Sequence, residues 1–316
     1  MASFSLPKSI LALLVILTLA SSSLGARPRK LDVWIPNPND YPDDSYLLKY
    51  HNGEVLQGNI PVHIIWYGDF SSPQKSIIID FLNSLTSSTW GQSNPSVAQW
   101  WSTIDQLYLS KVSNQQTQIN LGNQIDWSYW WGKYLTMSQI AQIASNAGTP
   151  RGGITLVLTA KDVTVEEFCS SHCAFHGSDQ SAGTTFIWVG NSESQCPGQC
   201  AWPFHQPLYG PQSPPLVPPN GDVGIEGMII NLASMLAGAV SNPFGNGYYQ
   251  GSTEAPMEAC TACPGVYGRG AYPGYAGQLW IDSTTGASYN ANGFNGREYL
   301  LPAIFDPTMA TCSTLN

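Results

Sequence analysis

The side chains with the most chemistry in this sequence are seven cysteines and the histidines near them. The cysteines are Cys169, Cys173, Cys196, Cys200, Cys260, Cys263 and Cys312. Two Cys-x3-Cys pairs lie close to His172, His176 and His205, which is a set of ligands that zinc uses. In an oxidising compartment the same thiols pair into disulfides, and the N-terminal export signal over residues 1–25 favours that interpretation. Seven is an odd number, so at least one thiol stays free or pairs between chains.

Other catalytic patterns are weaker. The sequence has no Gly-x-Ser-x-Gly elbow and no Gly-x4-Gly-Lys-Ser/Thr phosphate loop. A Cys173–His176 pair would need a thiolate, which oxidation to a disulfide removes. A glycosidase needs two carboxyl groups that flank the scissile bond. The candidate acids are Glu54, Asp69, Glu193, Glu226, Glu254, Glu258 and Asp282. Because the chain has 21 acidic residues, some pair always looks plausible, and a hydrolase stays open as the alternative.

Tryptophans gather in two short segments with few charges. Trp100 and Trp101 are adjacent, and Trp127, Trp130 and Trp131 stand among serine and tyrosine. Flat indole faces beside hydroxyl and amide groups suit stacking on sugar rings. Most tryptophans fill protein cores, so we expect that role for the majority. An exposed subset would make a saccharide-binding groove.

Composition limits the classes of function. The chain has 316 residues, with 12 Lys and Arg against 21 Asp and Glu, and a pI near 4.8. No basic face is available to displace counterions from phosphates, which argues against nucleic acid and anionic membrane surfaces. Hydrophobic residues make up 43% of the chain and charged residues only 10%, which favours a large buried core over disorder.

The first residues predict export. Residues 1–25 contain Lys8, an apolar run over 10–20 and small residues over 21–25, which is typical of a secretory signal peptide. A retained signal anchor is the alternative, but the run is short for a membrane span. Residues 26–45 are rich in proline and aspartate and predict an extended arm. No later segment has 18 uninterrupted apolar residues, so we expect no membrane insertion after signal cleavage.

The elements that position these side chains alternate between strands and helices. Strands are predicted over 60–67, 118–121, 153–159 and 185–189, and helices from Pro73 to about Leu85 and over 95–109, 138–144 and 224–240. Ser138 is the expected cap of the third helix, and Asn242-Pro243 is expected to end the fourth. The prolines of 206–221 predict an ordered surface loop. This order predicts a single α/β (α+β) domain over 46–316, with a mixed sheet, packed helices and disulfides.

Several runs resemble the EXORDIUM / phosphate-induced protein 1 family of plants. The runs are 59–68 (NIPVHIIWYG), 186–192 (FIWVGNS), 195–205 (QCPGQCAWPFH), 231–245 and 268–277 (GRGAYPGYAG). The resemblance covers about 46–312. It implies a protein secreted to the apoplast and cell wall and tied to cell expansion, brassinosteroid-responsive growth and carbon status, with no established enzymatic activity. It also implies disulfides among Cys169, Cys173, Cys196, Cys200, Cys263 and Cys312, with Cys260 as the extra cysteine.

A second, fainter resemblance is to secreted zincin-like metallopeptidases, through a buried helix that ends in Asn-Pro. Aligned on Asn242-Pro243, the positions of the zinc ligands and the general base fall on Ser234, Met235 and Gly238, which cannot bind zinc or act as a base. This implies a degenerate scaffold with no catalytic residue, metal or cofactor.

The sequence therefore predicts a secreted, non-catalytic binding protein. Its expected partner is a cell-wall polysaccharide or an extracellular protein, and the alternative is a hydrolase that acts on the wall. The candidate ligand cleft consists of Trp66, His176, His205 and Glu258.

Overall fold

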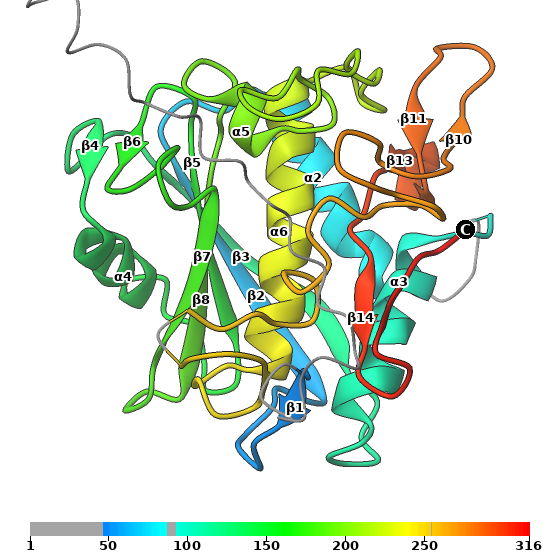
Figure 1. Cartoon of the computed structure of the whole chain (residues 1–316). Coiled ribbons are helices and arrows are strands. Elements are labelled where there is room, and N and C mark those ends of the chain that lie inside the picture. The colour runs from blue at the N-terminus through cyan, green and yellow to red at the C-terminus, as the bar shows by residue number, and fades with distance from the viewer. Residues whose placement is uncertain (1–46, 87–92, 254) are drawn as a thin grey trace, which may run out of the picture. The chain divides into compact units, whose positions relative to one another are not determined.

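A five-stranded mixed sheet lies at the centre of the computed structural model, which describes residues 47–86, 93–253 and 255–316 (Figure 1). The predicted signal peptide (1–25), the predicted arm (26–45) and the candidate acid Glu254 lie outside the described residues. The strands, in their order across the sheet, are β3 (Gln118–Trp127), β2 (Asn59–Tyr67), β5 (Ile154–Thr159), β8 (Thr184–Gly190) and β7 (Ala174–Asp179). The first four are parallel and β7 is antiparallel to β8, which confirms the mixed sheet.

Burial follows the position of each strand in the sheet. All six residues of β5 are buried, as are the last six of β2, because both strands are covered on both faces. The edge strand β3 alternates less regularly and keeps several exposed side chains. The sheet therefore supplies a rigid, apolar platform whose strand ends carry the polar residues.

Helices cover both faces of this sheet. The elements are α2 (Ser72–Thr86), α3 (Val97–Ile104), the π-helix η2 (Asp105–Leu109), α4 (Met137–Ser145), the short α5 (Pro197–Cys200) and α6 (Val223–Ser241). Helix α6 packs on β7 and β8 and touches α2, which lies against β3, while α4 packs against β5. The right-handed crossovers that parallel strands adopt predict α2 and α4 on opposite faces.

Helix α6 is buried on nearly every side, as its sequence predicts. Ile225, Ile229, Leu236 and Val240 have no exposed surface. By length and composition this helix could also cross a membrane, but it is the central core helix of the described chain. Asn242 is its C-cap and its last turn is followed by Pro243, which confirms the predicted end.

Two-stranded sheets and turns make up the remainder. They pair β1 (Lys49–Tyr50) with β9 (Tyr248–Tyr249), β4 (Tyr134–Leu135) with β6 (Thr164–Val165), β10 (Trp280–Ile281) with β11 (Ser288–Tyr289), β12 (Ala291–Asn292) with β13 (Glu298–Tyr299), and β14 (Ile304–Asp306) with β15 (Thr311–Ser313). A short 3-10 turn, η3 (Phe294–Gly296), precedes β13.

The structure corrects three of the predicted elements and adds one strand. The predicted strand over 118–121 continues to Trp127 in the structure. The prediction ended too early because the exposed second half of the strand lacks a regular alternation of apolar residues. The predicted helix over 95–109 begins at Val97, after the N-cap Ser96, and widens into the π-helix from Asp105. Helix α4 is capped by Thr136 and not by Ser138, because Thr136 forms a capping box with Gln139. Strand β7 was not predicted.

Three disulfides join the predicted cysteines. Cys169 pairs with Cys196 and Cys173 with Cys200, so two bonds connect the two Cys-x3-Cys segments, and Cys263 pairs with Cys312. Cys260 is free and buried. The zinc-site alternative is wrong for these cysteines because their sulfurs are held in disulfides.

Candidate functional site

The carboxyl ends of the parallel strands β2, β5 and β8 meet at a small polar cavity, which we call the carboxyl-edge crevice. It has a volume of about 300 Å³ and is lined by Asp69, Ser71, Gln74, Lys161 and Asn191. The chain passes from β2 outward to β3 and later returns to β5 on the other side, so the sheet order reverses here. In open α/β sheets, ligands bind outside the carboxyl ends of the strands at such a switch point.

Asn191 directly follows β8 and is only 2% exposed. Its backbone N–H donates to the Thr159 carbonyl at 3.0 Å, and its Oδ1 accepts from the Glu193 N–H at 3.0 Å. Gly224 allows this arrangement, because a Cβ there would lie 2.3 Å from the Asn191 Oδ1. Within the described chain no residue accepts a hydrogen bond from the Asn191 Nδ2. The amide is therefore a fixed donor in the wall of the crevice.

Lys161 is also held in a defined place. Its carbonyl accepts hydrogen bonds from the Ser194 hydroxyl at 2.6 Å and from the Gln195 Nε2 at 3.0 Å. Its Nζ lies 3.2 Å from the Glu193 Oε1, and both side chains are partly exposed. The ammonium group therefore reaches the crevice from a braced backbone, with Glu193 beside it.

The opposite wall of the crevice is the start of α2. The Gln74 Oε1 accepts from the Ser71 N–H at 3.0 Å, while the Gln74 Nε2 donates to the Asp222 Oδ2 at 2.9 Å. Asp222 in turn caps α6. Two helix N-termini are thus tied together beside Asp69, whose carboxylate is exposed. The lining of the crevice therefore combines donors with a carboxylate.

An exposed tryptophan lies on the same edge of the sheet, in the loop that follows β3. Trp130 is 83% exposed, whereas Trp100 and Trp101 are buried and donate to the carbonyls of Pro302 and Thr117. Tyr67 fixes the loop through its hydroxyl, which accepts from the Trp131 N–H at 2.9 Å and donates to the Gly132 carbonyl at 2.8 Å. Among the described residues, four tryptophans are buried and three more pack against the core while partly buried, whereas Trp130 presents a free aromatic face.

Two residues of the predicted ligand cleft come together elsewhere. The His176 Nε2 of β7 lies 2.8 Å from the Glu258 Oε2, and the Asn242 Nδ2 donates to the Glu258 Oε1 at 2.7 Å. Gly238 makes room for them, since a Cβ there would lie 2.2 Å from the Glu258 Oε2. The His176 Nδ1 is buried without a partner. The pair links β7 to the end of α6, and it lines neither the crevice nor the cavity described next.

The other two members of the predicted cleft lie apart from that pair. Trp66 is buried, donates to the Gln124 Oε1 at 3.2 Å and packs edge-on against Phe70. His205 is exposed and its Nδ1 lies 3.0 Å from the Gln206 carbonyl. Among the described residues no hydrogen bond or ring contact joins Trp66 or His205 to His176 or Glu258. The four-residue cleft as such stays a prediction.

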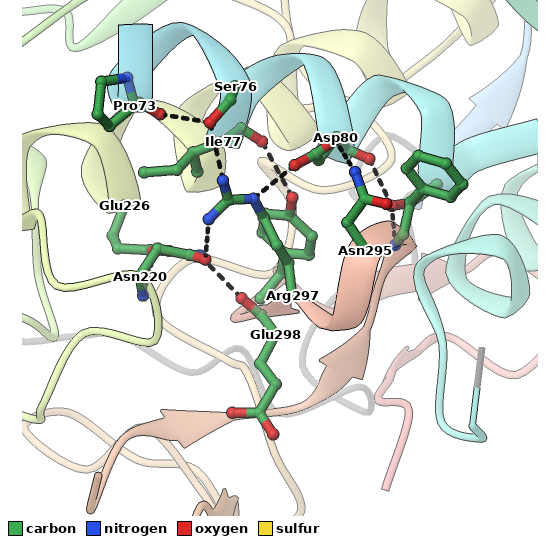
Figure 2. A network of polar contacts seen from close by, with 12 residues as sticks. Pro73, Ser76, Ile77, Asp80, Asn220, Glu226, Asn295, Arg297 and Glu298 are labelled. Carbon is green, nitrogen blue, oxygen red and sulfur yellow. Dashed lines mark hydrogen bonds and ion pairs between the residues drawn. The ribbon is translucent and has the colours of Figure 1, made fainter. Parts of the chain in front are cut away.

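A second cavity, of about 600 Å³, is lined in part by an ion pair that connects α2 to the C-terminal part of the chain. Figure 2 shows this ion pair and its neighbours. The Arg297 Nε donates to the Asp80 Oδ2 at 2.7 Å, and its two terminal nitrogens donate to the Asn220 Oδ1 at 3.0 Å and the Ser76 hydroxyl at 2.8 Å. Asn295 donates to the other Asp80 oxygen at 3.0 Å. Figure 2 shows the guanidinium between α2 and the segment before α6. This network is a brace whose charges are already paired.

Glu226 lies behind that brace and is fully buried. Its Oε1 accepts from the backbone and side chain of Asn220 at 3.0 and 2.6 Å, while its Oε2 has no partner. Burial raises the pKa of Glu226 to about 7, against the lowering effect of the Asn220 hydrogen bonds. The carboxyl group is thus a proton-binding site inside the core.

Comparison with known proteins places the chain in a family. Residues 48–315 match the phosphate-induced protein 1 conserved region. The chain belongs to the phosphate-induced protein 1 family. It is 55% identical to Protein PHOSPHATE-INDUCED 1 of Nicotiana tabacum over 295 residues, which cover 91% of this chain and 92% of the relative. It is 55% identical to Protein EXORDIUM of Arabidopsis thaliana over 288 residues, covering 87% and 91%, and 53% identical to Protein EXORDIUM-like 2 of the same plant over 278 residues, covering 85% and 90%.

The predicted family resemblance is therefore confirmed. No solved structure matches this phosphate-induced protein 1 family member. The zincin-like scaffold consequently has no support from the comparisons. The three positions aligned with zincin ligands, Ser234, Met235 and Gly238, lie within α6. Among the described residues no group of three or more His, Cys, Asp and Glu side chains is placed to hold a metal ion.

Sequence reasoning missed the crevice of this family member, although it named two acids at the edge, Asp69 and Glu193. Lys161 and Asn191 were not singled out, since each is an ordinary polar residue in sequence. The available signal was the position of Lys161, two residues after β5, and of Asn191, directly after β8. That signal needs the strand order, because only adjacent parallel strands bring their ends together.

Proposed function

We propose that this protein binds a neutral saccharide of the plant cell wall in the carboxyl-edge crevice, without catalysis. The observation that carries the proposal is the convergence of Asp69, Lys161 and Asn191 from the ends of three adjacent strands. A sugar hydroxyl both donates and accepts hydrogen bonds. Asp69 accepts from such hydroxyls, whereas the Lys161 ammonium and the Asn191 amide donate to them. Trp130 adds an exposed aromatic face on the same edge.

The charge of the site favours a neutral ligand over a polyuronate. Lys161 is already paired with Glu193, and Asp69 adds a further negative charge. Removal of the predicted signal peptide, which contains Lys8, leaves 11 basic against 21 acidic residues, a net charge of −10. A chain of carboxylates would meet repulsion both in the crevice and over the whole protein.

We further propose that the protein is exported to the apoplast and takes part in growth and cell expansion, linked to brassinosteroid response and carbon status. Three disulfides support an oxidising compartment. The family also supports a plant protein of this kind, since its relatives carry the EXORDIUM name. An extracellular protein is the other partner consistent with the family.

A wall hydrolase is the competing function, because Asp69 and Glu193 both lie at the carboxyl edge. Glu193 is partly exposed and already ion-paired with Lys161. The proposal therefore assigns these acids to binding.

The test uses mature protein purified from a secreting host. It is applied to an array of wall oligosaccharides that includes xyloglucan, xylan, mannan and oligogalacturonate fragments. We expect saturable binding to a neutral glycan, at least tenfold weaker in Trp130→Ala. Trp280→Ala is the matched control, because Trp280 is also exposed, at 52%, but lies on the β10–β11 hairpin. The release of reducing ends, which would report cleavage of glycosidic bonds, is measured on the same samples.

Each other outcome overturns part of the proposal. Binding to oligogalacturonate alone would refute the neutral ligand, and equal losses in both tryptophan variants would refute the crevice. Release of reducing ends that Asp69→Asn or Glu193→Gln abolishes would establish the hydrolase. Absence of both binding and turnover would favour a protein partner.

A further inference from the structure

Two tyrosines stand at the ends of a closed turn in the C-terminal part of the chain. In the segment Tyr272-Pro273-Gly274-Tyr275, the Tyr272 N–H donates to the Tyr275 carbonyl at 3.0 Å, and the Tyr275 N–H donates to the Tyr272 carbonyl at 2.7 Å. Proline and then glycine are the residues that a tight turn of this kind requires, and Gly274 has a φ of +90°. The sequence therefore places two phenol rings side by side.

The turn is fixed at its base. The Gly274 carbonyl accepts from the Ser213 hydroxyl at 2.7 Å, and Gly274 packs against Pro211 of the proline-rich loop. The Ala276 carbonyl accepts from the N–H groups of Tyr267 and Gly268. The tyrosines thus extend from an anchored turn and not from a free loop.

The two rings touch while both stay accessible. Their centroids are 5.1 Å apart, with an angle of 41° between the ring planes. Tyr272 is 64% exposed and Tyr275 is 39% exposed. Among the described residues, the other tyrosine pairs in ring contact both include Tyr248, which is only 6% exposed. Contact and exposure coincide at Tyr272 and Tyr275.

We propose that Tyr272 and Tyr275 are an oxidative modification site that closes into an intramolecular dityrosine. The oxidant is hydrogen peroxide, used by a haem peroxidase. Each phenol loses one hydrogen atom, and the two tyrosyl radicals join through a carbon–carbon bond between positions ortho to their hydroxyl groups. The two hydrogen atoms and the electrons they carry reduce one peroxide molecule, whose O–O bond breaks, to two molecules of water. The displaced ring hydrogens return to the phenol oxygens.

Proximity makes this pair react with itself. Rings joined by a direct carbon–carbon bond have centroids only slightly closer than those of Tyr272 and Tyr275, so coupling needs a small movement. Holding two reactants together replaces an encounter between molecules with a unimolecular step. Tyr134, which is 62% exposed on β4, forms no ring contact with another tyrosine among the described residues, so it has no partner held in place for coupling.

The cross-link would also fix the rim of an apolar cavity. Tyr275 lines a cavity of about 400 Å³ together with Trp202, Leu216 and Ile281. A bond to Tyr272 holds the Tyr275 ring in place on that rim. The modification is independent of saccharide binding, because the crevice contains neither tyrosine.

The experiment treats dilute, disulfide-intact mature protein with a haem peroxidase and limiting hydrogen peroxide. We expect dityrosine fluorescence in a product that stays monomeric and has lost two hydrogen atoms in mass. Peptide fragmentation should place the bond between Tyr272 and Tyr275. Tyr272→Phe and Tyr275→Phe should each reduce the monomer fluorescence at least tenfold.

Tyr134→Phe is the matched control, because it removes a tyrosine of nearly the same exposure. It should leave the monomer fluorescence unchanged, and circular dichroism of the three variants should match that of the unsubstituted protein. The proposal is overturned if the monomer keeps its full mass, if the product consists only of covalent dimers, or if Tyr275→Phe still forms the monomeric cross-link.

Discussion

Single residues decide what the carboxyl-edge crevice can recognise. The Asn191 Oδ1 is used by the Glu193 N–H, which leaves the Nδ2 as a donor toward the crevice. Lys161 donates and Asp69 accepts, so the three side chains match the two-way hydrogen bonding of a hydroxyl group. Two buried titratable groups outside the crevice, Glu226 and Cys260, also have testable consequences.

The first concerns Glu226 and pH. Its pKa is about 7 in the folded protein, against an ordinary value of 4.5, because it is desolvated. Between these pH values the folded protein holds a proton that the unfolded chain has released. The free energy of unfolding therefore falls as pH rises from about 4.5 to about 7, by roughly 3 kcal/mol from this group alone.

Urea unfolding across this pH range tests the prediction. Glu226→Gln keeps the shape of the protonated carboxyl group but does not ionise, so its free energy of unfolding should vary less with pH than that of the unsubstituted protein. The two proteins should be similar near pH 4.5 and the variant more stable above pH 7. Parallel pH profiles would contradict the assignment.

The second concerns Cys260, which is free and buried. Burial raises the pKa of its thiol, with a further contribution from the negative charge of Glu258. Since the thiolate is the reactive form, iodoacetamide should leave the native protein unmodified and add one group after denaturation without reduction. Intact mass measures both states. Rapid alkylation of native protein would show that the thiol is accessible.

At the scale of elements, polar contacts brace the helices that surround the sheet. The Arg297–Asp80 pair ties α2 to the chain before β13, with side chains 25% and 10% exposed. Lys75–Asp126 also joins α2 to the sheet, but the Asp126 side chain is 71% exposed. Removal of one partner of a mostly buried pair leaves an uncompensated charge, whereas exposed pairs contribute little.

Arg297→Met should therefore lower the free energy of unfolding by about 3 kcal/mol. Lys75→Met, the matched control on the same helix, should change it by about 1 kcal/mol or less. The double variant Asp80→Asn/Arg297→Met should recover part of the loss, because the stranded carboxylate is gone. Chemical denaturation gives all three values. Equal effects of Arg297→Met and Lys75→Met would refute the brace.

Elements whose apolar residues recur at a regular helical or strand spacing were predictable from sequence, and elements without such spacing were not. Ile225, Ile229 and Leu236 recur at helical spacing, so α6 was predicted within one residue at each end. Strand β7 was missed because His176, Gly177 and Ser178 interrupt its pattern at the sheet edge. The family could be recognised from contiguous runs. The crevice could not, because Asp69, Lys161 and Asn191 are distant in sequence and only the strand order joins them.

At the scale of the whole molecule, the disulfides hold together segments that lack regular structure. Two of them tie the loop before β7 to α5 and the residue before it, and Cys263–Cys312 connects the turn-rich region to β15. The last bond spans 49 residues. The strands of this C-terminal region are only two or three residues long, so the covalent bond supplements short two-stranded sheets.

Cys263→Ser/Cys312→Ser should lower the free energy of unfolding by about 4 kcal/mol, because the unfolded chain regains the entropy of a long loop. The Cys169–Cys196 bond spans 27 residues between segments that Cys173–Cys200 also joins, so its removal alone releases a short loop and should cost less. Thermal and urea unfolding under non-reducing conditions measure both. A larger loss for the shorter loop would show that native contacts, and not loop length, set the contribution.

In the proposed site, the Asn191 amide is the donor to a neutral sugar. Asn191→Asp keeps the Oδ1 that accepts from the Glu193 N–H, replaces the donor with an acceptor and adds a negative charge. The decisive measurement is isothermal titration of the mature protein and of this variant with the neutral wall oligosaccharide that gives the strongest array signal. We predict one binding site, with an affinity at least about tenfold lower in the variant, the equivalent of about 1.4 kcal/mol. Equal affinities in two folded proteins would contradict a saccharide site in the carboxyl-edge crevice.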